Sequence, residues 1–165
     1  MENKGTEQIS AAEQNGRGWV DMIAAAYEAH QFCAAGFHHL SQQACNLSRE
    51  ARAVIKGHGF DGSNHDLVGE CIEDAMRVAP LELRVRTGWH APGWDGRMPP
   101  EEFEILLSTG GPALRLVGEL DDAEPARCWL EIQDWGTPWT RLHCRHEREI
   151  DAVRWFACLF YYGEA

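Results

Sequence analysis

The sequence predicts an α+β domain in which N-terminal helices pack on a four-stranded antiparallel meander and a C-terminal helix completes the core. Three observations predict it. Apolar residues recur at helical intervals up to about residue 80, alternate with polar ones between 81 and 133, and return to helical spacing near the C-terminus. The chain has 165 residues, 44% hydrophobic and 25% charged, which suffices for one domain with its own core.

The first part of the chain is predicted to be helical. Residues 1–16 are polar and show no periodicity, so we expect them to be disordered and the single domain to comprise residues 17–165. Helical spacing runs from about 18 to 55, as one helix or as two in tandem that break at Gly36, and a glycine-rich loop follows over 56–65. Asp66 is expected to cap a further helix, and Pro80 ends this helical part at residue 79. The buried stripe of that helix is predicted to be Leu67, Val68, Cys71, Ile72, Ala75 and Met76.

The second part, residues 80–165, is predicted to hold the meander and the last helix. Leu81, Leu83 and Val85 alternate with charged residues, which is typical of a half-buried strand. Further strands are expected over 103–108, 114–120 and about 128–133, and short connections between them favour antiparallel pairing. A helix is expected over about 147–162, its buried face lined by Ile150, Val153, Ala157 and Phe160.

The negative charge is concentrated in one segment. The chain carries 26 acidic and 15 basic side chains, a net charge of −11, and residues 66–135 hold 15 of the acidic and only 6 of the basic ones. This balance argues against a nucleic-acid-binding protein with a broad basic face. The segment is either a solvated surface that favours solubility or an acidic face that meets a basic partner. For the second interpretation we predict that the partner-binding residues are Glu119, Asp121, Asp122, Glu124, Glu131 and Asp134.

The histidines and cysteines do not form a recognisable metal site. His38, His39 and Cys45 lie near Cys33, and His143, Cys144 and His146 form a second group, but neither has the paired spacing of a zinc site. Cys144, flanked by His143, Arg145 and His146, is the only cysteine in a locally cationic setting, and therefore the one candidate nucleophile. We expect no metal, no cofactor and no catalytic residue. The N-terminal sequence lacks the pattern of a signal peptide, so we expect a cytoplasmic protein with reduced thiols.

Four stretches of the second part resemble a family of phage and prophage proteins of unknown function. They are Val85-Arg-Thr-Gly-Trp89, Phe103-Glu-Ile-Leu-Leu-Ser-Thr-Gly-Gly-Pro-Ala113, Gly118-Glu-Leu-Asp121 and Leu130-Glu-Ile-Gln-Asp-Trp-Gly-Thr-Pro-Trp-Thr140. Members also end in Phe-Tyr-Phe-Gly-Glu, close to Phe160-Tyr-Tyr-Gly-Glu164 here. The resemblance covers residues 81–165. The chain departs from it at Arg141-Leu142, where members often carry an acidic residue and a tyrosine.

The resemblance implies a mobile-element origin and expression in the cytoplasm of an infected bacterium. Small acidic phage proteins often inhibit host defence by binding, so we expect a non-enzymatic inhibitor of a defence complex with a basic surface, such as an anti-CRISPR protein acting on a CRISPR effector. The alternatives are a phage enzyme, a hydrolase or nuclease acting during replication, and a structural or regulatory accessory protein. We expect no direct binding to nucleic acid or membrane. Seven tryptophans leave more aromatic surface than one small core absorbs, which favours a homodimer.

Overall fold

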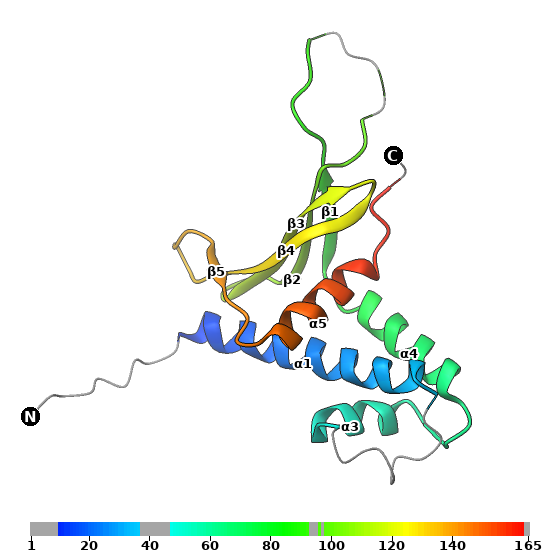
Figure 1. Cartoon of the computed structure of the whole chain (residues 1–165). Coiled ribbons are helices and arrows are strands. Elements are labelled where there is room, and N and C mark those ends of the chain that lie inside the picture. Colours follow the sequence, from blue (N-terminus) through cyan, green and yellow to red (C-terminus); the bar gives the residue numbers. More distant parts are fainter. Residues whose placement is uncertain (1–9, 37–46, 93–95, 97, 164–165) are drawn as a thin grey trace, which may run out of the picture.

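The computed structural model describes residues 10–36, 47–92, 96 and 98–163. Helices come first along the chain, then a sheet, then a last helix (Figure 1). The helices are α1 (Ala11–Ala34), α3 (Arg49–Gly57), α4 (His65–Arg77) and α5 (Glu147–Cys158). The strands are β1 (Glu82–Arg86), β2 (Glu102–Ser108), β3 (Ala113–Asp121), β4 (Glu124–Gln133) and β5 (Thr140–Leu142). The predicted α+β class is confirmed.

The sheet is an antiparallel meander, with its strands in the order β1-β2-β3-β4-β5. The prediction of four strands missed β5. This strand is three residues long and pairs with β4 through Leu130 and Leu142, among others. Three residues are too few for an alternating pattern to be recognised in the sequence.

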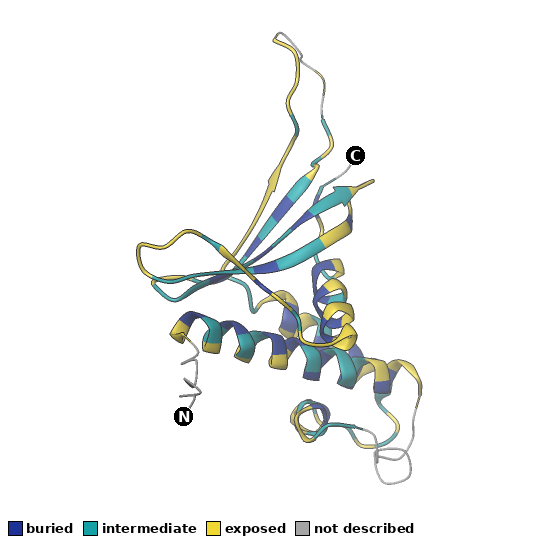
Figure 2. Cartoon of the chain, turned by 60° about the vertical axis from the view of Figure 1, so that its left-hand side comes forward, coloured by how far each residue is buried: buried dark blue, intermediate teal, exposed yellow. Residues whose placement is uncertain are grey.

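Helices α1 and α5 lie on one face of the sheet, and α3 and α4 pack against α1 (Figure 1). α1 packs on β3 and β4, and α5 packs on β4 and α1. Figure 2 shows buried positions on both layers where they meet. Side chains from the strands and helices form one core that includes Phe103, Ile105, Leu114, Leu116, Leu130, Ile23, Ile72 and Phe156. The opposite face of the sheet, called the outer face below, carries the alternate residues of each strand.

Helix α1 begins earlier than predicted. The Ser10 side chain accepts a hydrogen bond of 3.1 Å from the Glu13 N–H, which satisfies one free donor of the first turn. Gly16 is buried, and a Cβ there would lie 2.6 Å from the Leu142 side chain, so its small size allows α1 to approach β5. The predicted disorder over 1–16 is therefore wrong for residues 11–16. Residues 1–9 lie outside the described residues, as does the 37–46 part of the predicted tandem helix.

Helix α4 begins at His65, with Asn64 rather than Asp66 at the N-cap position. The Asn64 side chain makes no cap hydrogen bond because it is used in the preceding loop, where it accepts from the Asp61 N–H and donates to the Gly59 carbonyl. Val68, Ile72 and Met76 of the predicted stripe are buried, but Leu67 is exposed. The stripe is thus narrower than predicted, because α4 packs mainly against α1.

Helix α5 ends at Cys158, four residues before the predicted boundary. Val153 and Ala157 are buried as predicted, whereas Ile150 is 56% exposed. Phe156, which the predicted stripe omitted, is fully buried and contacts the Phe160 ring edge to face. The buried face is therefore rotated toward Phe156 relative to the predicted one.

Strand β1 forms as predicted but is not half-buried. Leu81, Leu83 and Val85 are 59%, 37% and 48% exposed. Leu83 and Val85 stand opposite Ile105 and Phe103, so they are on the helix side of the sheet. They are exposed because α1 and α5 pack over β3 and β4, away from this edge of the sheet.

The hairpin between β3 and β4 sets the positions of the charged residues. Asp122 and Ala123 form its two-residue turn, both with positive φ (49° and 63°), as a type I′ turn requires. The turn pairs Asp121 with Glu124, and the register then shifts by one residue between Glu119 and Leu120. Because of this bulge, Glu119 and Arg127 share one face of the sheet.

Gly118 allows close packing on the helix side of the sheet near the β3–β4 turn. A Cβ at Gly118 would lie 2.2 Å from the Arg127 carbonyl oxygen and 2.5 Å from the Phe103 ring. The Phe103 ring in turn packs against Tyr162, with 4.7 Å between centroids.

In the part of the chain that the structure describes, no helix is both long and apolar enough to cross a bilayer.

Candidate functional site

The outer face of the sheet is charge-balanced rather than acidic. The strand register places five glutamates and five arginines on it. These are Glu82, Glu102, Glu104, Glu119, Glu131, Arg84, Arg86, Arg115, Arg127 and Arg141. Cross-strand pairs of opposite charge stabilise such a surface modestly.

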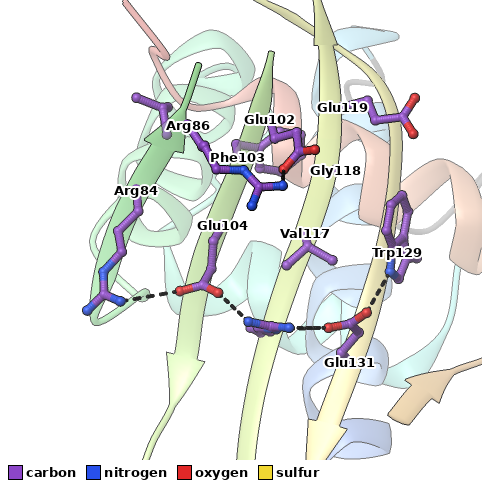
Figure 3. Close-up of a pocket in the computed structure, with 12 residues that line it drawn as sticks. Arg84, Arg86, Glu102, Phe103, Glu104, Val117, Gly118, Glu119, Trp129 and Glu131 are labelled. Atoms are coloured by element: carbon purple, nitrogen blue, oxygen red, sulfur yellow. Dashed lines mark hydrogen bonds and ion pairs between the residues drawn. The ribbon is translucent and has the colours of Figure 1, made fainter. Parts of the chain in front are cut away.

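A continuous row of ion pairs crosses four strands of the outer face (Figure 3). Arg84 lies 3.7 Å from Glu104, and Arg115 lies 2.6 Å from Glu104 and 2.7 Å from Glu131. Glu131 also accepts a hydrogen bond of 3.0 Å from the Trp129 indole. The Arg115 guanidinium lies 4.2 Å from the centre of the Trp139 ring, which adds a cation–π contact. Arg115 is thus the centre of this row.

Beside the row, the outer face is hollowed. The hollow has a volume of about 620 Å³. Val117 lies in the middle of it, between Glu104 on β2 and Trp129 on β4, its two neighbours in the strand register (Figure 3). The hollow therefore combines an apolar centre with a charged rim.

Two carboxylates of like charge stand opposite each other on this rim. Glu102 pairs with Glu119 across β2 and β3. Arg86 on β1 forms an ion pair with Glu102, and Arg127 on β4 approaches Glu119 to 2.6 Å. Like charges directly opposite each other destabilise a sheet, and these two arginines offset the repulsion from the sides.

The carboxylates without such compensation lie at the end of the sheet that carries the β3–β4 turn. Asp121, Asp122 and Glu124 make no ion pair with any described residue. Glu101 lies at the same end of the sheet, because its backbone carbonyl accepts a hydrogen bond of 2.8 Å from the Leu120 N–H. We call Glu101, Glu102, Glu119, Asp121, Asp122 and Glu124 the acidic sheet end. Six carboxylates and the two contacting arginines leave it a net charge of −4.

The structure brings together four of the six residues predicted to bind a partner, namely Glu119, Asp121, Asp122 and Glu124. Glu131 does not belong to this group, because it is half-buried and neutralised by Arg115. Asp134 follows the end of β4 that lies opposite the β3–β4 turn. At about 3.3 Å per strand residue, it is roughly 30 Å from Glu124 at the start of β4. Its carboxylate accepts a hydrogen bond from the Trp135 N–H. The six residues therefore do not form one group in the structure, and their role in binding a partner stays a prediction.

Sequence reasoning missed Glu101, Glu102 and the apolar centre of the hollow. Glu101 precedes β2 and Glu102 is its first residue, and only the pairing of β2 with β3 brings them beside Glu119 and Leu120. The register places Val117 and Trp129 opposite each other on the outer face. A signal was present, since Val117 and Trp129 both alternate with buried leucines in their strands.

Cys144 and Cys128 are not activated as nucleophiles. Burial and the nearby Glu149 raise the pKa of Cys144, against the opposing effect of Arg17, Arg141 and Arg145. Burial raises the pKa of Cys128 to about 11. A reactive cysteine needs a lowered pKa, so the cationic neighbours of Cys144 in the sequence do not produce one. Among the described residues, no group of three or more His, Cys, Asp or Glu side chains could hold a metal ion. His38, His39 and Cys45 lie outside the described residues.

A second hollow of about 400 Å³ adjoins the first and shares Arg86 and Glu102 with it. Trp89, at the start of the loop after β1, lines this second hollow and is fully exposed. Exposed tryptophans are frequent anchors in protein interfaces. The two hollows and the acidic sheet end thus form one continuous candidate binding surface.

Comparison with known proteins adds no relative to this picture. No family model, no curated protein and no solved structure matches the chain. The resemblance to phage proteins stays a prediction that rests on the stretches quoted above.

Proposed function

We propose that the chain is a non-enzymatic binding protein that docks a basic protein surface on its acidic sheet end. The observation that carries the proposal is the uncompensated charge of Asp121, Asp122 and Glu124 beside a hollow with an apolar centre. Complementary charges speed association and exclude partners of the wrong charge.

The hollow suits one basic side chain of the partner. An arginine or lysine has an apolar stem and a charged head. The stem would lie over Val117 and against the Trp129 ring, which also favours a cation. The head would lie between Glu102 and Glu119, where it adds to the compensation that Arg86 and Arg127 already give these two like charges.

The predicted partner is a defence complex of a bacterial host, with a CRISPR effector favoured. Such a complex carries a basic channel because it must hold nucleic acid. An acidic protein that occupies the channel blocks it without any chemical step. The phage setting comes from the resemblance of residues 81–165, and the charge comes from the acidic sheet end.

The test measures two quantities: binding to the effector complex, and protection of a phage from the CRISPR system of its host. The chain is expressed in bacteria whose CRISPR system targets a plaque-forming phage, and plating is compared with and without it. The purified effector complex of the same host is titrated with the chain at 0.05 M and 0.5 M NaCl. We expect restored plating, and an affinity that falls at least about tenfold at the higher salt because exposed charges are screened.

Two variants and one control locate the docking surface. Asp121→Lys with Asp122→Lys should weaken binding mainly through the association rate, because these side chains are exposed at the rim. Val117→Arg should fill the hollow with the chain's own cation and weaken binding as well. Asp151→Lys, an exposed reversal on α5, is the matched control and should have little effect. Unchanged plating together with no binding to the effector would refute the defence role. Binding that both docking-surface variants leave unchanged would refute the docking surface.

A further inference from the structure

Strand β1 presents a free edge and an uncovered apolar row. It is the first strand of the sheet order, so one side of its backbone faces no other strand of the described residues. All five of its residues are exposed. Leu81, Leu83 and Val85 turn their side chains toward the helix side, where α1 and α5 do not cover them. Figure 2 shows this strand as the exposed margin of the sheet.

Three common protections of an edge strand are missing from β1. Edge strands avoid pairing with other chains through a proline, a bulge or a charge that points inward. Within β1 there is no proline, and its pairing with β2 runs without a register shift from Glu82 to Arg86. Its three charged residues, Glu82, Arg84 and Arg86, all lie on the outer face. The inward positions are apolar.

We propose that β1 pairs antiparallel with β1 of a second copy of this chain, with the twofold axis at Leu83. In this register Leu83 faces its own counterpart, and Leu81 faces Val85 of the other copy twice. The two uncovered apolar rows then lie side by side and shield each other from water. The two sheets join into one sheet of ten strands.

In the same register, the charges of β1 in one copy are complementary to those of β1 in the other copy. Glu82 of each copy faces Arg84 of the other, which gives two pairs of opposite charge and no like-charged pair. Within one chain, Glu82 and Arg84 already contact each other at 2.5 Å, so both heads are held at this position. Arg86 remains bound to Glu102 of its own chain. This self-complementarity selects a second copy over an unrelated partner, and it is independent of the function proposed above.

Sedimentation equilibrium of the full chain between 1 and 100 µM tests the proposal. We expect a mass rising toward twice the 18.6 kDa of one chain. Glu82→Arg alone places two arginine pairs across the axis, and Arg84→Glu alone places two glutamate pairs there. Each should raise the dimer dissociation constant at least about tenfold, because both attractive pairs become repulsive.

Mixing the two variants gives the decisive result. A heterodimer of the Glu82→Arg chain and the Arg84→Glu chain regains two opposite-charge pairs, so the mixture should dimerise as the unchanged chain does. Arg49→Glu on α3, whose side chain is 94% exposed, is the matched control and should leave the mass unchanged. A mass that stays at 18.6 kDa for the unchanged chain would overturn the proposal. So would a dimer that neither single variant weakens, or a mixture that fails to recover.

Discussion

Replacing Arg115 by methionine should measure how much the charged row of the outer face stabilises the fold. Arg115 lies 2.6 Å from Glu104 and 2.7 Å from Glu131, and its guanidinium stacks on Trp139. Its side chain is only 24% exposed, and those of the two glutamates are 23% and 19% exposed. These contacts are therefore screened less than those of a fully exposed pair.

The expected loss is the sum of a few modest contributions. Each ion pair contributes about 0.5–1 kcal/mol at this exposure. The cation–π contact adds roughly 0.5–1 kcal/mol. The methionine retains most of the apolar stem, so packing changes little. The free energy of unfolding should fall by about 1.5–3 kcal/mol.

Urea unfolding followed by tryptophan fluorescence gives this free energy. Arg49→Met is the control, because Arg49 is 94% exposed and contacts only the adjacent Glu50 among the ion pairs of the described residues. It should cost less than about 0.5 kcal/mol. In 1 M NaCl the difference between the two variants should shrink but persist. If Arg115→Met costs no more than Arg49→Met, the row is a solvated surface and the reasoning fails.

Two further predictions concern the fold. Gly118→Ala should destabilise the chain by roughly 1–3 kcal/mol or prevent folding, because the added methyl meets the Arg127 carbonyl and the Phe103 ring. Thermal unfolding measures this effect, and an unchanged melting temperature would contradict the prediction. Burial opposes ionisation of Glu149, but hydrogen bonds from Arg145 hold its pKa below the ordinary value. Its stabilisation is therefore complete above about pH 4.5 and is lost as the pH falls through the lowered pKa. Glu149→Gln should cost about 1.5–3 kcal/mol at pH 7, and urea unfolding should show that difference narrowing at pH 3.5; a constant difference would argue against it.

The order of elements could be predicted from the sequence because it depends on local periodicity. Spacing of three and four residues around Ile23 and Ile72, and alternation around Ile105 and Leu116, are properties of each segment alone. The concentration of charge between residues 66 and 135 is likewise a property of the sequence. The α+β class follows from the order of these patterns.

Which charges remain uncompensated was decided only by the tertiary structure. The two-residue turn at Asp122 and Ala123, continued without interruption, would place Arg115 opposite Leu130. The bulge next to Glu119 shifts the register by one residue, so Arg115 meets Glu131 and both lie on the outer face. A shift of one residue moves every side chain to the other face of a sheet, and nothing in the local pattern specifies it.

The exposure of β1 was also decided by tertiary structure. Leu81, Leu83 and Val85 have the same alternation as Phe103, Ile105 and Leu107, yet only the second set is buried. Alternation shows that a strand has an apolar side, but it does not show whether a helix covers that side. Coverage depends on where the helices cross the sheet, and here α1 and α5 lie over β3 and β4. The sequence by itself therefore determined the elements and their polarity, and packing over long distances along the chain determined which surfaces remain open.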